Sequence, residues 1–404
     1  MRNHLPIAHP WGFPAGLFPV FWEFVAAPFP ASSCCQWEWA GRTSAFQTYQ
    51  VQSSVPEIRT SEWTVEPLDP GDHRAWDDFV LGHPHGSPFH LIAWKKTIEE
   101  SFGYRPYYLW VREGSQVRGI LPLFAVKNAI IGHVLISTPF AVYGGILADS
   151  PETRDALYAR ARALGKDLGV EYIELRNAYP EQCGGEANVS RYVSFAQPLL
   201  PDENATLESL PKKTRNLVRK ALRYPFQMKY GVKDLRHFED LYAANMRRLG
   251  TPCFPSTYFA NLTRHFGGIV DVRETWLFGK PLAASLNFLF RGEMHIYYAA
   301  ADTRFNAVGP NTFMYFDHLC WAGRNGYKSF DFGRCKRGTG VFEFKRHWNT
   351  TMRELPYEVV LIRRKGLPNF SPANPRFDLA IKLWRKVPLW LTRLLGPRLI
   401  RLFP

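Results

Sequence analysis

Residues 328–348 read KSFDFGRCKRGTGVFEFKRHW. The first five, Lys328–Phe332, predict a short β-strand, because apolar and polar side chains alternate and turn residues follow. A glycine-rich turn then leads into a helical segment over Val341–Trp348. Asp331 and Arg334 lie at the end of this strand, and the ends of strands in open α/β sheets commonly line ligand crevices. A structural ion pair between these two residues is the alternative interpretation.

Around this stretch, the chain predicts a sheet with helices. Three strands are expected over 272–278, 282–290 and 294–301, and the short turns between them indicate an antiparallel meander. Helices are expected at 235–249, 256–266 and 311–323, with a last strand at 357–363.

Residues 62–201 predict a further mixed unit. Strands are expected at 63–68, 107–112, 117–126 and 170–176, and helices from Gly71 to Val80, after Ser87-Pro88 and after Ser150-Pro151. The fold class is therefore α/β with mixed sheets. Four regions follow from composition and pattern: an irregular extension (1–61), a first domain (62–201), a second domain (202–365) and a basic tail (366–404).

Composition narrows the function. With 46% hydrophobic and 15% aromatic residues, the chain of 404 residues is neither disordered, collagenous nor a coiled coil. The net charge of +14 indicates a polyanionic partner: nucleic acid, a phosphorylated cofactor or an anionic membrane. The extension is proline-rich and aperiodic, which suggests a mis-assigned translation start, with a signal peptide as the alternative. No segment matches a transmembrane helix.

Cysteine and histidine usage points away from metal and thiol chemistry. The six cysteines include no C-x-x-C pair, so neither a zinc site nor a disulfide framework is expected, and a reducing compartment is the default. His83, His85 and His90 lack neighbouring carboxylate or thiolate ligands, so no metal site is predicted. Cys335 has no recognisable histidine partner, and His318 and His347 are interpreted as structural histidines.

A basic segment opens the second domain. Lys212, Arg215 and Arg219 share one face of a predicted helix and are candidates for binding the phosphates of a donor; a solvated basic face is the alternative. Gly338, Thr339 and Gly340 precede a helix, where exposed backbone amides favour an anion.

Several of these motifs together resemble the FemAB-like acyltransferases. The resemblance rests on the 330–348 signature, on Tyr297-Tyr298-Ala299-Ala300 followed by Gly309-Pro310-Asn311, and on the basic segment 212–220. The subgroup associated with exosortase/PEP-CTERM systems is the most similar, through Pro88-Phe89-His90-Leu91 with Trp94 and through Thr138-Pro139-Phe140 to Tyr143-Gly144-Gly145.

The resemblance implies two GNAT-like acyltransferase domains that transfer an acyl or aminoacyl group to an amine or hydroxyl. It assigns Lys345 to the acceptor phosphates or to the developing negative charge, with a surface lysine as the alternative. Asp331 and Arg334 complete the expected catalytic set. The candidates for substrate binding are Tyr298, Asn311, Tyr143, Gly144, Gly145 and Lys336.

The tail predicts a separate property. Residues 361–404 contain ten Lys or Arg and one acidic residue, Asp378, so +9 of the net charge of +14 lies there. Phe377, Ile381 and Trp384 share a helical face, which predicts a helix lying on an anionic membrane over 376–402. Packing of that face on the second domain is the alternative.

The sequence therefore predicts a cytoplasmic acyltransferase, peripheral at the inner membrane, that modifies a cell-envelope or exopolysaccharide precursor. Acyl-CoA or aminoacyl-tRNA is the expected donor, no permanently bound cofactor is expected, and tRNA remains open as a partner. A covalent enzyme intermediate is not required. The alternative function is a non-catalytic scaffold that binds polyanions or membranes and carries a decayed GNAT site.

Overall fold

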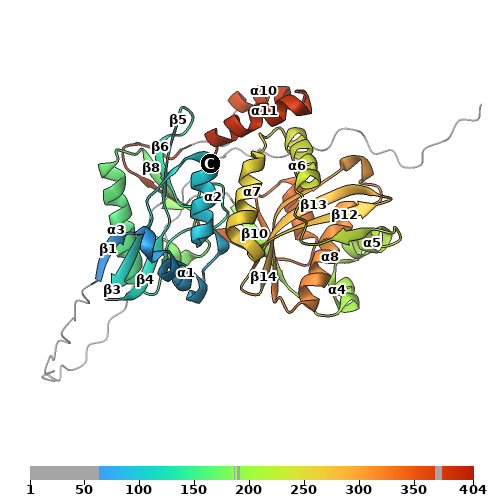
Figure 1. The fold of residues 1–404 in the computed structure, drawn as a ribbon, viewed down its shortest axis with the longest axis horizontal. Coiled ribbons are helices and arrows are strands. Elements are labelled where there is room, and N and C mark those ends of the chain that lie inside the picture. Colours follow the sequence, from blue (N-terminus) through green and yellow to red (C-terminus); the bar gives the residue numbers. More distant parts are fainter. Residues whose placement is uncertain (1–62, 186, 189–191, 369–374) are drawn as a thin grey trace, which may run out of the picture.

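The computed structural model describes residues 63–185, 187–188, 192–368 and 375–404 (Figure 1). The predicted extension, 1–61, lies outside these residues. The described chain forms three sheets with helices packed against them, arranged as two halves side by side. The mixed α/β class is confirmed.

The first half contains two sheets. The four-stranded sheet has the order β1 (Trp63–Pro67), β3 (Leu109–Glu113), β4 (Gln116–Leu121) and β7 (Leu147–Ala148). The six-stranded sheet has the order β2 (Arg105–Pro106), β5 (Phe124–Asn128), β6 (Gly132–Ile136), β8 (Tyr172–Leu175), β17 (Glu358–Leu361) and β9 (Ala187–Asn188). The helices are α1 (His73–Gly82), α2 (Ile92–Phe102) and α3 (Pro151–Asp167). The single strand expected over 117–126 is wrong: β4 ends before Pro122, which has no N–H for a sheet ladder, and β5 joins the other sheet.

One seven-stranded sheet organises the second half. Its order is β11 (Gln227–Lys229), β12 (Val270–Leu277), β13 (Lys280–Phe290), β14 (Glu293–Ala301), β15 (Ser329–Cys335), β10 (Tyr192–Pro198) and β16 (Thr351–Leu355). The predicted meander is confirmed as β12–β13–β14. Helices α4 (Glu203–Ser209), α5 (Lys212–Ala221), α6 (Arg236–Leu249), α7 (Ser256–Phe266), α8 (Pro310–Arg324) and α9 (Gly340–Arg346) accompany it.

The two faces of this sheet have separate cores. On one face, Phe238 of α6 and Tyr258 of α7 are buried in a cluster with Leu286 of β13. On the other, Met314 and Leu319 of α8 are buried with residues of β14 and β15. Apolar burial on both faces fixes the sheet as the rigid platform of the second half.

Each half supplies a strand to the sheet of the other. β10 precedes every other strand of the second half in sequence, yet it lies between β15 and β16. β17 follows the second half in sequence but pairs with β8 and β9 in the first. A domain boundary at residue 201 stays a proposal, since the chain crosses between the sheets on both sides of it.

The tail forms α10 (Pro375–Trp384) and α11 (Leu389–Leu399), which lie across both halves (Figure 1). In the second half, Trp384 Nε1 donates to Thr251 O at 3.2 Å. In the first, Tyr104 Oη donates to Arg401 O at 2.8 Å. Trp384 is thus turned toward the protein and not toward a membrane, as is Ile381, whose Cγ2 lies against Gly250. The side chain of Phe377 is outside the described part of the chain.

None of the helices in the described ranges is both long and apolar enough to cross a bilayer.

Candidate active site

The site begins where two parallel strands separate. β14 and β15 pair only along Glu293–His295 and Ser329–Asp331. Two residues after Asp331, Gly333 takes a φ of 73°, a conformation that glycine adopts without strain. The polar side chains next to this point are buried between the two halves.

Asp331 lies at the centre of the cluster, with its side chain almost fully buried. Its Oδ2 accepts from Tyr143 Oη at 2.7 Å, and its Oδ1 accepts from Ser194 Oγ at 3.0 Å and from Gly333 N at 2.6 Å. Burial raises the pKa of this carboxyl, but His295 and the hydrogen bonds from Tyr143 and Gly333 outweigh it and hold the pKa below its usual value. Asp331 is therefore ionised at neutral pH.

His295 is the neighbour that the sequence did not single out. Its Nδ1 lies 3.8 Å from Asp331 Oδ2, while its Nε2 is buried and has no hydrogen-bond partner within the described chain. Burial lowers the pKa of the ring, so the imidazole is neutral at pH 7. The facing carboxylate favours the proton on Nδ1, which leaves Nε2 with a free lone pair.

Lys345 is buried and not a surface lysine. Its Nζ donates to Gly333 O at 2.8 Å and to Arg334 O at 3.0 Å. These two bonds use two of the three ammonium hydrogens, and the third remains for another acceptor. Burial lowers the pKa of this amine to about 8. At neutral pH the side chain is mostly a cation with one donor to spare.

Lys345 and His295 converge over one glycine. A Cβ on Gly333 would lie 3.2 Å from His295 Nε2 and 3.8 Å from Lys345 Nζ. Because Gly333 has no side chain, the lone pair of His295 Nε2 and the ammonium group of Lys345 both face the space that a Cβ would occupy.

Arg334 contacts the tyrosines Tyr357 and Tyr192 and not Asp331. Its Nη1 donates to Tyr357 Oη at 3.0 Å, and its guanidinium lies 4.7 Å from the ring centre of Tyr192. Among the described residues no ion pair joins Arg334 to Asp331, so that alternative is wrong. Lys336 lies nearby, 5.5 Å from the same Tyr192 ring.

Arg353 extends the cluster toward the surface. Its guanidinium lies 5.5 Å from the ring centre of Tyr143 and 4.3 Å from that of Tyr179.

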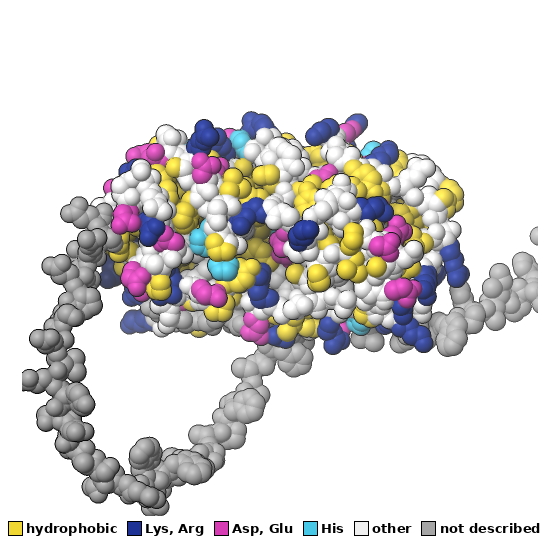
Figure 2. All heavy atoms as spheres, turned by 90° about the horizontal axis from the view of Figure 1, so that it is seen from below, with side chains coloured by type: hydrophobic (Ala, Val, Ile, Leu, Met, Phe, Trp, Pro, Cys, Tyr) yellow, Lys and Arg dark blue, Asp and Glu magenta, His cyan; other side chains and the backbone are white. Residues whose placement is uncertain are grey.

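Glu293 is a second titratable group near Asp331. Its pKa is raised to about 7 by burial and by the charge of Asp331. The rings of His85 and Tyr179 are 4.0 Å apart. Figure 2 shows histidine and basic side chains around hydrophobic surface near the middle of one face.

The glycines of the first half act through the backbone. A Cβ on Gly144 would lie 1.8 Å from Thr138 Oγ1, and one on Gly145 would lie 2.0 Å from Asn177 Oδ1. Gly145 O accepts a hydrogen bond from His90 Nε2 at 3.0 Å. These contacts hold the loop that carries Tyr143 to Asp331.

The other predicted substrate residues lie outside the cluster. Tyr298 is half-buried, and its Oη is 3.1 Å from Tyr258 Oη among the aromatic side chains of α6 and α7. Asn311 lies in the first turn of α8. Neither residue has a contact with Asp331, His295 or Lys345 among the described hydrogen bonds.

The predicted donor residues lie on α5 and at the start of α9. Arg215 and Arg219 both form ion pairs with Glu208, whereas Lys212 is exposed. Gly338 and Gly340 are exposed, and Thr339 Oγ1 accepts from Phe342 N at 3.2 Å. Thr339 thereby caps α9, a helix of seven residues.

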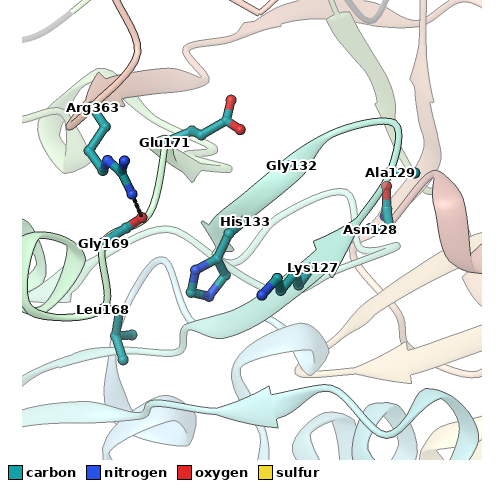
Figure 3. Close-up of a pocket in the computed structure, with 9 residues that line it drawn as sticks. All are labelled: Lys127, Asn128, Ala129, Gly132, His133, Leu168, Gly169, Glu171 and Arg363. Atoms are coloured by element: carbon teal, nitrogen blue, oxygen red, sulfur yellow. Dashed lines mark hydrogen bonds between the residues drawn. The ribbon is translucent and has the colours of Figure 1, made fainter.

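A separate pocket of about 680 Å³ lies in the first half, beside the β5–β6 hairpin (Figure 3). Lys127 and His133 line it, and Arg363 donates across its rim to Gly169 O at 3.3 Å. None of its lining residues belongs to the cluster around Asp331.

Comparison with known proteins agrees with this architecture. Residues 209–346 match the family described as acetyltransferase (GNAT) domain. The crystal structure of FemX has a TM-score of 0.60 at 15% identity, covering 74% of this chain and 98% of FemX. No curated protein matches the sequence.

Two further solved structures are similar at lower scores. One is the C-terminal domain of a putative lysylphosphatidylglycerol synthetase from Agrobacterium fabrum, with a TM-score of 0.49 and 12% identity over 78% of this chain and 96% of that one. The other is a tandem GNAT protein from the clavulanic acid biosynthesis pathway, with a TM-score of 0.47 and 12% identity over 76% of this chain and all of that one. Residues 209–346 match an acetyltransferase (GNAT) domain, and the protein is an acyltransferase with a fold similar to that of FemX.

Proposed function

We propose that this acyltransferase moves an acyl or aminoacyl group directly from an activated donor to an amine or hydroxyl of a cell-envelope or exopolysaccharide precursor. The observation that carries the proposal is the convergence of His295 Nε2 and Lys345 Nζ over Gly333. Acyl transfer needs a base for the attacking group and a donor for the developing oxyanion, and these two side chains supply both.

His295 acts as the general base. Its neutral ring has a free lone pair on Nε2, which takes the proton from the attacking amine or hydroxyl as the new bond to the acyl carbon forms. The ionised Asp331 next to Nδ1 then stabilises the imidazolium. The proton leaves with the departing group of the donor when the tetrahedral intermediate collapses.

Lys345 stabilises negative charge. Two of its hydrogens are held by the carbonyls of Gly333 and Arg334, which fixes the direction of the third. A preorganised, buried ammonium stabilises an oxyanion more strongly than a solvated one does, because little solvent screens the interaction.

A covalent thiol intermediate is disfavoured. Burial raises the pKa of Cys183 to about 11 and that of Cys320 to about 12, and it raises those of Cys253 and Cys335 as well. Every cysteine in the described ranges is therefore protonated at neutral pH, and a thiol is a much weaker nucleophile than a thiolate.

The donor is acyl-CoA or aminoacyl-tRNA, both of which are anionic. Lys212, Arg215 and Arg219 on α5 are the proposed phosphate contacts, with the amides around Gly338, Thr339 and Gly340 as a second group. The end of α5 adjoins the start of α8, since a Cβ on Gly309 would lie 3.4 Å from Ala221 Cβ. Tyr143, Tyr298, Asn311 and Lys336 are the proposed acceptor contacts, and the resemblance to the exosortase/PEP-CTERM subgroup favours a glycan precursor at the inner membrane.

The test has two steps. Mass spectrometry of small molecules that copurify with the protein identifies the donor, and acyl transfer from that donor to amine and hydroxyl acceptors is then followed in single turnover. We expect transfer by the wild type and a much slower reaction by both Lys345→Met and His295→Gln. A folded wild type that transfers nothing from either donor class would support the scaffold alternative.

A further inference from the structure

The outer face of the two tail helices is apolar where surface helices are usually polar. Leu379 and Leu383 of α10 are 66% and 57% exposed, and Trp390 and Leu394 of α11 are 67% and 57% exposed. Each pair is spaced i, i+4, so its members lie on one side of their helix. Four large apolar side chains are thus presented to solvent by two consecutive helices.

Basic side chains lie among them. Lys382 of α10, Lys386 just after α10, and Arg393 and Arg398 of α11 are exposed at positions three or four residues from the apolar ones. Residues 379–404 contain no acidic residue. We call these eight side chains the tail face: Leu379, Lys382, Leu383, Lys386, Trp390, Arg393, Leu394 and Arg398.

The opposite sides of the helices hold the tail face in place. Trp384 is bonded to Thr251 O, and a Cβ on Gly396 of α11 would lie 2.7 Å from Cys253 Sγ. Beyond α11, Arg176 Nη2 donates to Pro404 O at 2.9 Å. Arg393 of the tail face also forms an ion pair with Asp240 of α6. The other contacts come from residues outside the tail face, so its four apolar side chains stay exposed while the helices are anchored to both halves.

We propose that the tail face docks the protein on the surface of an anionic phospholipid bilayer. Leucine and tryptophan side chains gain free energy by entering the boundary between headgroups and acyl chains, while lysine and arginine reach the phosphates. These are different residues from the Ile381 and Trp384 face that the sequence favoured.

Other occupants fit the tail face less well. RNA would pair with the basic side chains and its bases can stack on Trp390, but it offers no apolar surface to Leu379, Leu383 and Leu394. A second copy of the chain would bring one basic face against another, and like charges repel. An anionic bilayer interacts favourably with both the basic charges and the exposed apolar area of the tail face.

The experiment uses the full-length protein and large unilamellar vesicles of phosphatidylcholine, with or without phosphatidylglycerol, followed by sedimentation. We expect binding to the phosphatidylglycerol vesicles, and an at least tenfold weaker partition for the variant Leu379→Ser/Leu383→Ser/Trp390→Ser/Leu394→Ser. Binding by a variant with Lys382→Gln, Lys386→Gln and Arg398→Gln should fall similarly and lose its dependence on salt.

Matched variants control for general effects. Leu81→Ser removes an apolar side chain that is 48% exposed on α1, and Arg74→Gln/Lys166→Gln/Lys280→Gln removes the same charge from other surfaces. Both controls should bind like the wild type. Equal binding of the tail-face variants and the wild type would overturn the proposal. So would binding to tRNA but not to vesicles, or dimerisation that the serine variant abolishes without any vesicle binding.

Discussion

The hydroxyl of Tyr143, in the first half, donates to Oδ2 of Asp331, in the second half, across 2.7 Å. The residue that carries the buried negative charge of the site is therefore positioned by the other half of the molecule. Tyr297 makes a comparable bond in the opposite direction, from the second half to Phe140 O in the first, at 2.6 Å. Both bonds connect the two halves, but only the bond from Tyr143 also contacts the buried charge of Asp331. Comparing the two tyrosines therefore separates the effect of connecting the halves from the effect on that charge.

Tyr143→Phe should slow transfer and lower stability. The change leaves Asp331 with Ser194 and Gly333 as donors, and removing one partner of a buried hydrogen bond costs about 1–3 kcal/mol. Denaturant unfolding and single-turnover rates measure the two effects. Tyr297→Phe is the matched control: it should lower stability similarly but leave the pH dependence of the rate unchanged, and an equal change of pH dependence in both would contradict the role of Tyr143.

Lys345→Met should be slow but folded. Loss of one preorganised donor to an oxyanion typically reduces turnover by about 100- to 1000-fold, or about 2.7–4 kcal/mol. Methionine has a similar length, but it leaves the carbonyls of Gly333 and Arg334 without this donor, so a moderate loss of stability, about 1–3 kcal/mol per unpaired group, is expected. Lys280→Met, at the exposed start of β13, should keep the wild-type rate. Equal rates for the two variants would remove Lys345 from the chemistry, and a collapsed melting temperature would make its role structural.

His295→Gln should lose the general base. Such a base contributes about 100- to 10,000-fold to a rate. His318 provides the control, because it is also fully buried, with a pKa lowered to about 4, and its Nε2 is 2.8 Å from Ser285 Oγ. His318→Gln should affect stability alone. If both variants transferred at the wild-type rate, the base would have to be sought elsewhere.

The pH dependence of rate and of stability should have opposite signs above pH 8. The charged form of Lys345 is needed, so the single-turnover rate should fall as the pH rises through about 8. An unfolded lysine titrates near 10.4, so between about 8 and 10.4 the folded protein holds fewer protons than the unfolded chain. The free energy of unfolding of the wild type, relative to Lys345→Met, should therefore rise across that window, by about 3 kcal/mol in total. A relative stability that stays flat would contradict the lowered pKa.

Gly333→Ala should abolish most of the activity. The added methyl group would occupy the space between His295 Nε2 and Lys345 Nζ, and the left-handed backbone at Gly333 costs about 1–2 kcal/mol for a residue with a Cβ. Gly279→Ala has the same φ of 73° in an exposed turn with open space around it, so it controls for the backbone strain. Similar rates for the two variants would show that the space over Gly333 is not used.

Local patterns were enough to predict most elements. Ser150 caps α3 by accepting from Thr153 N, as the Ser-Pro start indicates, and the short turns at Gly279 and Gly292 define the meander. Lys345 and Asp331 could be selected because they lie together in one short signature. What local patterns do not contain is pairing over long distances, so β10, with Ser194, and β16, with Arg353, were not predicted.

His295 was missed for a similar reason. It lies within a strand that was predicted, but a single histidine among apolar residues is more often a satisfied core residue than a base. Only the three-dimensional arrangement shows that its Nε2 is unpartnered and lies next to Lys345 and Asp331. The proposed tail face differs from the predicted one because Ile381 and Trp384 pack at the end of α6 and on residues 250–251. Both sides of the helix carry leucine or tryptophan, so the sequence pattern alone did not select the side.

The exchange of β10 and β17 also sets an order for folding on the ribosome. The place between β8 and β9 is filled only by β17, at Glu358–Leu361, and this strand is synthesised after nearly all of the second half. Nascent chains would therefore expose an unpaired edge of β8 from the synthesis of Leu175 until that of Glu358, and such edges are sites of misassembly. Closure of the first half must wait for the last strand, so the two halves complete their folding together.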